Sequence, residues 1–195
     1  MSDLMDVMGQ LTRGDGLKRL SEQLGIDEES LGKGVTAAMP LLVTALAQRA
    51  SSPDGARALH GALARDHEGS ALDDARGALD GARTGEGGRI LGHVLGDRQT
   101  TAETAVARTS GMEPEAAALL LATLAPVVMG ALGRIQQQHG LDAEGLSNRL
   151  RQEEQKAQQV APDWMNLATR LLDRNQDGSI LDDVGGFVGK LFEKR

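Results

Sequence analysis

The sequence predicts an all-α protein: a multihelical bundle built from an internal tandem repeat, followed by a C-terminal helix-loop-helix that carries an EF-hand-like loop. Aromatic residues make up only 2% of the chain and hydrophobic residues 40%. Alanine, leucine, valine and methionine must therefore build the core, and this composition favours helices over strands. No segment alternates apolar and polar residues in the way that is typical of a strand.

A repeat with an offset of 86 residues is the second observation behind this prediction. The matched pairs are Gly25 and Gly111, Asp27 and Glu113, Pro40 and Pro126, and Leu46 and Leu132. Each copy reads as a helix that ends at glycine, a short turn, an apolar helix and a third helix. Because proline lacks an N–H group and clashes with the preceding turn, we expect the apolar helix to bend or restart at both prolines.

Caps and apolar spacing predict the helices of the first half in order. Residues 4–11 have apolar side chains at helical spacing and form a short N-terminal helix, and residues 17–24 form a second helix that stops at Gly25. Asp27 is placed to cap the next helix. Ser52-Pro53 then combines an N-cap with a proline at the first helical position and opens a helix to about residue 64.

The second half is predicted in the same way. Residues 100–103 have the spacing of a capping box, and Glu113-Pro114 opens a long apolar helix that ends near residue 140. A polar helix follows over 142–158. A helix from Pro162 and a last helix with apolar residues at 184–191 flank the candidate metal loop.

These elements predict four parts of the chain. Residues 1–68 form a first helical repeat, 69–88 a flexible connector rich in glycine, aspartate and alanine, 89–158 a second helical repeat, and 159–195 the C-terminal helix-loop-helix.

Charge and composition exclude several classes of function. The chain has 21 lysines and arginines against 28 acidic residues, a net charge of -7, and no cysteine. Nucleic-acid binding is not expected, because no basic cluster is present, and thiol chemistry is excluded. Residues 1–11 carry Asp3 and Asp6 and lack a basic start, so we expect no signal peptide and cytoplasmic residence by default. Signal-independent export is left open.

The strongest ligand motif is the first half of a calcium loop. Asp173, Asn175 and Asp177 place side-chain oxygens at loop positions 1, 3 and 5, and Gly178 follows at position 6, where the chain must turn sharply. A backbone carbonyl near Ser179 would add a further oxygen. Hard divalent cations prefer this set of ligands.

The second half of the loop departs from the pattern. Val184 stands at position 12, where a bidentate glutamate is typical, while Asp182 and Asp183 come one or two residues early. Either aspartate would close a shortened loop, so we expect weak binding of one Ca²⁺. The alternative is an Asx-rich turn between two helices, in which Asp182 or Asp183 caps the second helix.

Two segments raise the question of membrane or helix association. Residues 116–133 carry no charge and reach the lower length limit of a membrane span, but Pro126 is central and Glu113 and Glu115 flank them. We therefore interpret this segment as a buried central helix. In the sequence 88–96, glycines at every fourth position predict a face that another helix approaches closely.

The chain resembles the YidB-like family of bacterial proteins. The resemblance covers most of the chain from about Gly25 onward and rests on three stretches: 87–93 (GGRILGH), 124–130 (LAPVVMG) and 172–183 (LDRNQDGSILDD). It implies a small all-helical fold with an intertwined tandem repeat and no established enzyme activity. Its acidic C-terminal loop, followed by an Asp-Asp pair, implies that Asp182 and Asp183 belong to the site.

Catalytic motifs are missing from the sequence. It contains no H-E-x-x-H, no G-x-S-x-G and no P-loop, and His60 and His67 have no third ligand nearby, so we expect both to be solvated. We expect a noncatalytic, calcium-binding helical protein that contacts an unknown protein partner or forms a homo-oligomer. The alternative is a membrane-interacting or oligomer-forming protein that uses residues 116–133.

Overall fold

The computed structural model describes residues 15–66 and 85–160, and every regular element in these ranges is helical. In chain order they are α2 (Asp15–Leu24), α3 (Glu28–Arg49), α4 (Pro53–Asp66), α7 (Glu86–Leu95), the 3₁₀ turn η1 (Gly96–Arg98), α8 (Gln99–Ser110), α9 (Pro114–His139) and α10 (Ala143–Val160). The all-α prediction is confirmed for this part of the chain.

Helices α3 and α9 are the most deeply buried elements. Every residue of α9 from 120 to 133 is buried, and between residues 34 and 47 of α3 only Thr36 is exposed. The largest fully buried side chains of the described residues are leucines and Ile135. Trp164, Phe187 and Phe192, the only aromatic residues, lie outside the described ranges. The described core is therefore aliphatic, as composition predicts.

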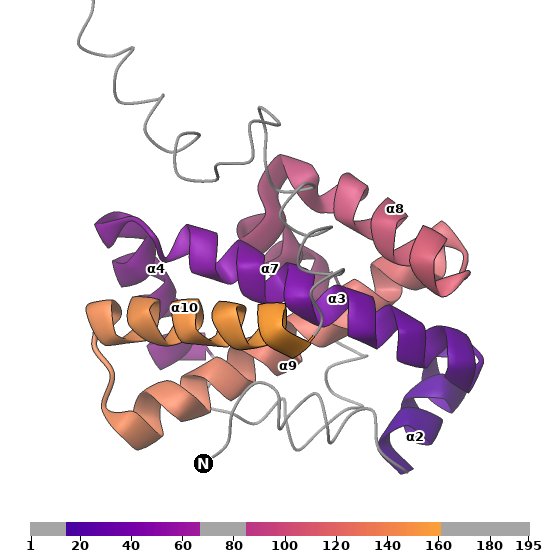
Figure 1. Cartoon of the computed structure of the whole chain (residues 1–195), viewed down its shortest axis with the longest axis horizontal. Coiled ribbons are helices and arrows are strands. Elements are labelled where there is room, and N and C mark those ends of the chain that lie inside the picture. The colour runs from indigo at the N-terminus through magenta and orange to yellow at the C-terminus, as the bar shows by residue number, and fades with distance from the viewer. Residues whose placement is uncertain (1–14, 67–84, 161–195) are drawn as a thin grey trace, which may run out of the picture.

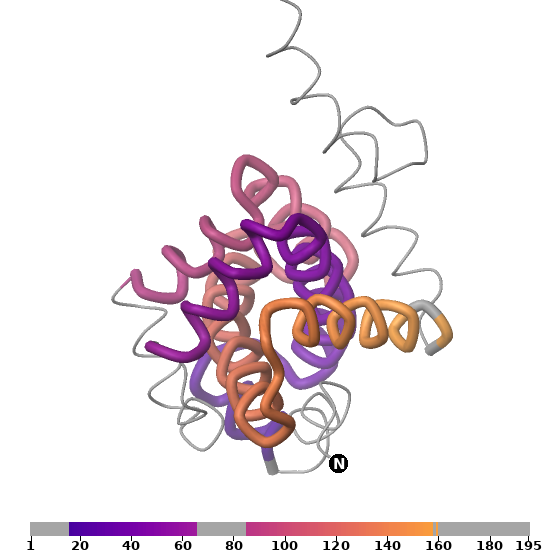
Figure 2. The backbone as a smooth tube through the Cα atoms, turned by 90° about the vertical axis from the view of Figure 1, so that its left-hand side faces the viewer, coloured from indigo at the N-terminus to yellow at the C-terminus, as the bar shows by residue number. Residues whose placement is uncertain are grey.

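The remaining helices cover this central pair (Figure 1). Helix α8 packs against both α3 and α9, α7 packs mainly against α9, and α10 lies across α3 and α4. Figure 2, seen from the end where α9 leads into α10, shows α10 along the outside of the bundle. Each end of the central pair thus meets a different set of neighbours.

Two corners with the same geometry lead into α3 and α9. Gly25 and Gly111 end the preceding helices with φ of 69° and 77°, in the left-handed region that favours glycine. Each glycine N–H donates to the carbonyl four residues earlier at 2.9 Å. Asp27 and Glu113 then take nearly identical extended conformations, with φ of -64° and -66°. The glycine stops predicted from the sequence are confirmed.

Both prolines lie inside continuous helices. Pro40 is in α3 and Pro126 is in α9, and both are buried. Of the two expected outcomes, a bend or a restart, the restart is wrong, and the bend stays a prediction. A proline removes one hydrogen bond from the ladder, whereas a break would also uncover the turns on either side, which are packed against neighbouring helices. Burial therefore outweighs the local cost.

Helix α7 approaches α9 at the turn that Pro126 weakens. Pro126 has no N–H to give to the carbonyl of Ala122, its partner in an ordinary helix. Gly87 packs against that carbonyl so closely that a methyl group on Gly87 would lie 2.8 Å from the carbonyl carbon and nearer still to its oxygen. Only a hydrogen fits, which is the geometry of a weak Cα–H···O contact.

The prediction that the regularly spaced glycines of residues 88–96 form the face that another helix approaches is wrong. Gly88 and Gly96 have no atom within 4 Å of an added methyl group, and Gly92 has only the side chain of Gln99 at 3.8 Å. The buried face of α7 is set by Leu91 and the apolar residues of the next turn, and Gly87 shares that face one turn earlier. Apolar side chains, not the regular spacing of glycines, orient the helix.

The predicted N-caps of α3 and α4 are confirmed, and Asp142, at which a polar helix was predicted to begin, caps α10. The Ser30 N–H donates to Asp27 Oδ1 at 2.8 Å, and Gly55 and Gly145 donate in the same way to Ser52 and Asp142.

The capping box at residues 100–103 is wrong. The turn η1 runs directly into α8, so the helix already begins at Gln99. The predicted helix at 4–11, most of the connector and the C-terminal helix-loop-helix lie outside the described residues.

We predict that Gly87→Ala destabilises the fold by about 1–3 kcal/mol, because the added methyl group overlaps the backbone of α9, which cannot move away as a side chain can. Urea unfolding monitored by far-ultraviolet circular dichroism measures the change. Gly88→Ala on the same turn is the matched control, since its methyl group meets open space, and we expect it to be neutral or stabilising by up to about 1 kcal/mol. Equal midpoints for the two variants would contradict the close approach.

Candidate functional site

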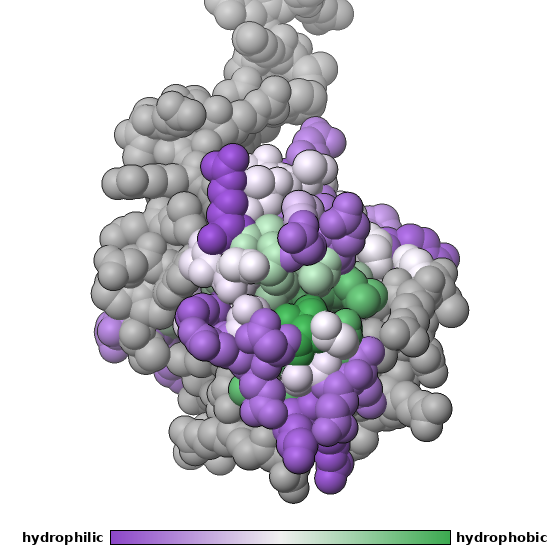
Figure 3. Space-filling model, turned by 90° about the vertical axis from the view of Figure 1, so that its right-hand side faces the viewer, coloured by the Kyte–Doolittle hydropathy of each residue, from purple (hydrophilic) through white to green (hydrophobic). Residues whose placement is uncertain are grey.

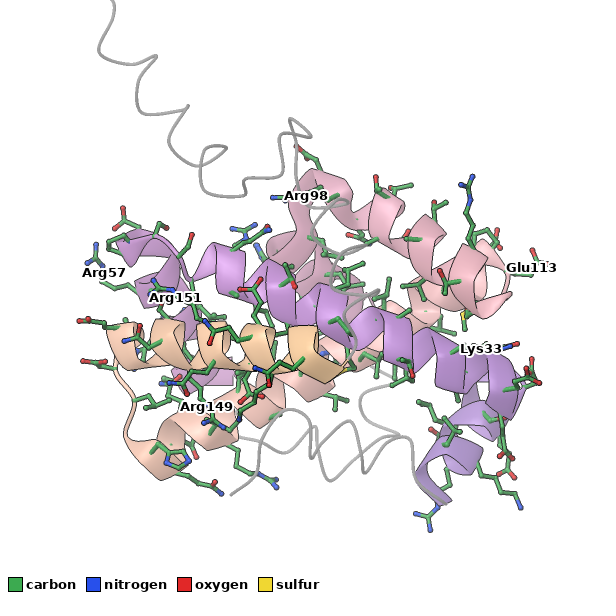
Figure 4. The ribbon with its side chains drawn as sticks, in the orientation of Figure 1. Lys33, Arg57, Arg98, Glu113, Arg149 and Arg151 are labelled. Carbon is green, nitrogen blue, oxygen red and sulfur yellow. The ribbon has the colours of Figure 1, made fainter. Side chains whose placement is uncertain are left out.

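A shallow open groove of about 540 Å³ lies between the first turns of α3 and the last turn of α8. Gly32, Thr36 and Thr109 line the groove, and the two threonines contribute hydroxyl groups. The groove is rimmed by Glu28, Glu29 and Lys33. Figure 4 shows Lys33 at this end of α3.

The charges of the groove are already paired or solvated. Lys33 Nζ donates to Glu29 Oε1 at 2.6 Å, and this hydrogen bond raises the pKa of Lys33. The Thr36 hydroxyl donates a hydrogen bond to the Gly32 carbonyl at 2.8 Å. Nearby, the Ser30 N–H donates to Asp27 and lowers the pKa of that carboxyl. The groove is thus open, and its ammonium group is paired with a carboxylate of the same helix.

Figure 3 views the end of the bundle where the two glycine corners lie, and shows hydrophobic side chains surrounded by hydrophilic ones. Leu24 and Met112, at these corners, are half-buried and pack against the core. Single half-exposed apolar residues are ordinary on protein surfaces. This face by itself therefore assigns no ligand.

A buried carboxylate on α10 is the most unusual polar group of the described residues. The Glu153 side chain is 1% exposed, and its Oε1 pairs with Arg149 at 3.1 Å and Lys156 at 3.3 Å. Within residues 15–66 and 85–160 its Oε2 has no hydrogen-bond partner. A buried acceptor without a partner costs about 1–3 kcal/mol. Figure 4 places Arg149 on α10.

The neighbouring carboxylate reaches the core helix α3. Glu154 is half-buried and hydrogen-bonded to Thr44, whose side chain is completely buried. Burial raises the pKa of Glu154, and the Thr44 hydrogen bond lowers it by a smaller amount. Docking of α10 therefore brings two adjacent acidic side chains, Glu153 and Glu154, out of full contact with water.

A second polar contact fixes the start of α10. His60 Nε2 on α4 lies 3.1 Å from the Leu141 carbonyl, just before α10, and Gln136 Nε2 donates to the His60 carbonyl at 3.5 Å. The expectation that His60 is solvated is therefore wrong. The ring is half-buried because the α9–α10 connection folds over it. His67 lies outside the described residues.

All the predicted metal ligands lie outside the described residues: Asp173, Asn175, Asp177, Ser179, Asp182 and Asp183. Among the residues that the structure describes, no group of three or more histidine, aspartate or glutamate side chains is arranged to hold a metal ion.

Glu153 was missed by reasoning from the sequence. Its position carried a signal, because Leu146, Leu150, Glu153 and Ala157 are spaced as one face of a helix and are all buried. A charge on such a face indicates a buried ionic group.

Length and composition would let α3 and α9 cross a membrane, but core helices of soluble proteins pass the same test. In their most apolar stretches 78% and 83% of the residues are buried inside the fold. The interpretation of residues 116–133 as a central helix agrees with this burial.

A family model described as "Bacterial protein of unknown function (DUF937)" matches residues 6–135, two thirds of the chain. The YidB-like resemblance is consistent with this match. Searches of curated proteins and of solved structures gave no match.

We predict that Glu154→Gln stabilises the protein at neutral pH, because the amide keeps an acceptor for Thr44 without burying a charge. The pKa of Glu154 is raised above 4.5 in the folded state, so its protonated form stabilises the fold below that pH and this contribution is lost as pH rises through the raised value.

The gain from Glu154→Gln should therefore shrink as pH falls through the raised pKa of Glu154 and be largely gone below about 4.5. Urea unfolding at pH 7 and at pH 4 measures both values. Glu22→Gln, at an exposed glutamate of α2, is the control and should give no such gain. A loss of stability at pH 7 for the Glu154 variant would contradict the role of burial.

Proposed function

The chain belongs to the DUF937 family of bacterial proteins of unknown function, and on that premise we propose that it is a noncatalytic, calcium-binding helical protein that acts through contacts with a protein partner or with itself. The observation that carries the proposal is the run from Asp173 to Gly178, in which oxygen-bearing side chains alternate and end at glycine. Such a run is specific, because only convergent oxygens and a sharp turn satisfy a hard cation.

The proposed ligands are Asp173, Asn175, Asp177, a carbonyl near Ser179, and either Asp182 or Asp183. Only two of the first three ligands are carboxylates, and no glutamate stands at position 12. Because affinity in such loops rises with carboxylate count and rigidity, we expect dissociation constants on the order of 10⁻⁵ to 10⁻³ M. At such affinity the ion stabilises the loop wherever calcium is abundant.

A noncatalytic role is supported by the groove and by the buried carboxylates. The groove between α3 and α8 is open and its lysine is paired. Glu153 is buried against packed helices, and Glu154 is half-buried and hydrogen-bonded to Thr44. Contacts with another macromolecule are then the simplest use of a rigid helical bundle with a net charge of -7.

We also infer that the bundle arose by duplication. Support comes from the matched corners at Gly25 and Gly111 and from the contact between equivalent residues of α3 and α9. A methyl group on Gly34 would lie 2.7 Å from Leu120, its counterpart at the 86-residue offset. Equivalent residues meet where a twofold axis relates two copies. In an experimental structure, residues 25–64 should superpose on residues 111–151. Failure of the two segments to superpose would contradict the duplication.

The membrane alternative receives less support. To insert residues 116–133, the protein would have to expose a helix whose central residues are fully buried in the bundle. Solubility without detergent separates the two proposals, because a membrane role predicts that extraction requires detergent.

We predict that calorimetry detects calcium binding to the intact protein at micromolar to millimolar concentration, and that Asp173→Ala/Asp177→Ala abolishes it. Trp164 precedes the loop by nine residues, so its fluorescence should change on binding. Glu22→Ala/Asp97→Ala removes the same number of exposed charges from the bundle and serves as the control. Identical heats for the intact protein and the loop variant would show that the loop is only a turn. A pull-down with and without calcium then tests for a partner.

A further inference from the structure

Helix α10 is held unequally along its length. Its first half contributes Leu146 and Leu150, both fully buried, and the His60–Leu141 contact fixes the connection just before it. Of the side chains that the structure describes in its second half, Glu153 and Ala157 lie at the same buried face. An alanine and a carboxylate bury far less apolar area than two leucines, so among these four side chains the hydrophobic attachment is concentrated in the first half.

The ion pairs of Glu153 do not attach α10 to the bundle. Arg149 and Lys156, the residues paired with its carboxylate, both belong to α10. These pairs move with the helix and persist when it is undocked. Docking therefore costs the carboxylate its water, while the two pairs add no attraction to another element.

A polar contact between Glu154 and Thr44 joins the second half of α10 to α3. Glu154 is hydrogen-bonded to Thr44, and burial opposes the charge of Glu154. Moreover, the family match ends at residue 135, before α10 begins. Helix α10 lies along the outside of the part of the bundle that this match covers (Figure 2).

We propose that α10 is a releasable strap: its second half, residues 151–160, peels from α3 and uncovers the surface around Thr44, while the end near Leu146 and His60 acts as the hinge. Opening returns both carboxylates to water and leaves the apolar core between α3 and α9 closed. Opening of the strap thereby exposes the face of α3 around Thr44 and moves the end of α10 from which the chain continues. This proposal does not depend on calcium binding.

Hydrogen exchange of the full-length protein, read by mass spectrometry, tests the strap. Amides of residues 153–157 should exchange at least about tenfold faster than those of the central part of α9, because local opening needs less free energy than global unfolding. Exchange of α10 at the same rate as the central part of α9, showing that α10 opens only in global unfolding, would overturn the proposal.

Substitutions at one buried and one exposed position separate a strap from a general change in stability. Glu153→Leu places an apolar side chain on the buried face and should slow exchange of α10 by at least about tenfold, while Gln155→Leu, at an exposed position of the same helix, should leave it unchanged. Glu153→Gln keeps the size of the side chain and should slow exchange in the same direction. If Glu153→Leu and Glu153→Gln slow α9 as much as α10, or slow neither, the strap is refuted.

Discussion

The described bundle depends on burying two helices, α3 and α9, in a core whose described residues include no aromatic side chain. A helix surrounded by neighbours needs an apolar surface all round, and α3 and α9 supply it with alanine, leucine, valine, methionine and glycine. Small residues bring helix axes closer together, because the separation of packed helices is set by the side chains at the contact. Gly34 against Leu120 and Gly87 against the backbone of Ala122 are two such contacts. In each contact, the residue on the opposite helix fills the space that the missing glycine side chain leaves.

This dense centre explains why proline is tolerated within it. Pro126 leaves the Ala122 carbonyl without its helical donor, and Gly87 brings another helix to that carbonyl. The same contact fixes where α7 sits along α9, since any larger residue would force the helices apart. A local defect in one helix and the absence of a side chain on another are therefore parts of a single packing arrangement.

Signals that act within a few residues were readable from the sequence, whereas those that depend on neighbouring helices were not. Gly25 and Gly111 mark helix ends because only their backbone conformation is at stake, and the caps at Asp27, Ser52 and Asp142 involve the nearest N–H groups. Continuity through the prolines depends on burial by other helices. The buried face of α7 likewise depends on α9, which regular glycine spacing does not encode. The candidate calcium loop rests on sequence alone, because its residues lie outside the described ranges.

The distribution of polar groups separates the centre of the bundle from its edge. Between α3, α8 and α9, the hydroxyl groups of the buried Ser110 and Thr123 donate hydrogen bonds to carbonyls of their own helices. These hydrogen bonds need no partner on a neighbouring helix. On α10, by contrast, the buried polar residues of the described chain include a carboxylate, Glu153, whose hydration is far more costly to remove than that of a hydroxyl group. Leucine at position 153 would extend the buried apolar face that Leu146, Leu150 and Ala157 already form. A carboxylate at that position lowers the cost of detaching α10 from the bundle, which is the physical basis of the proposed strap.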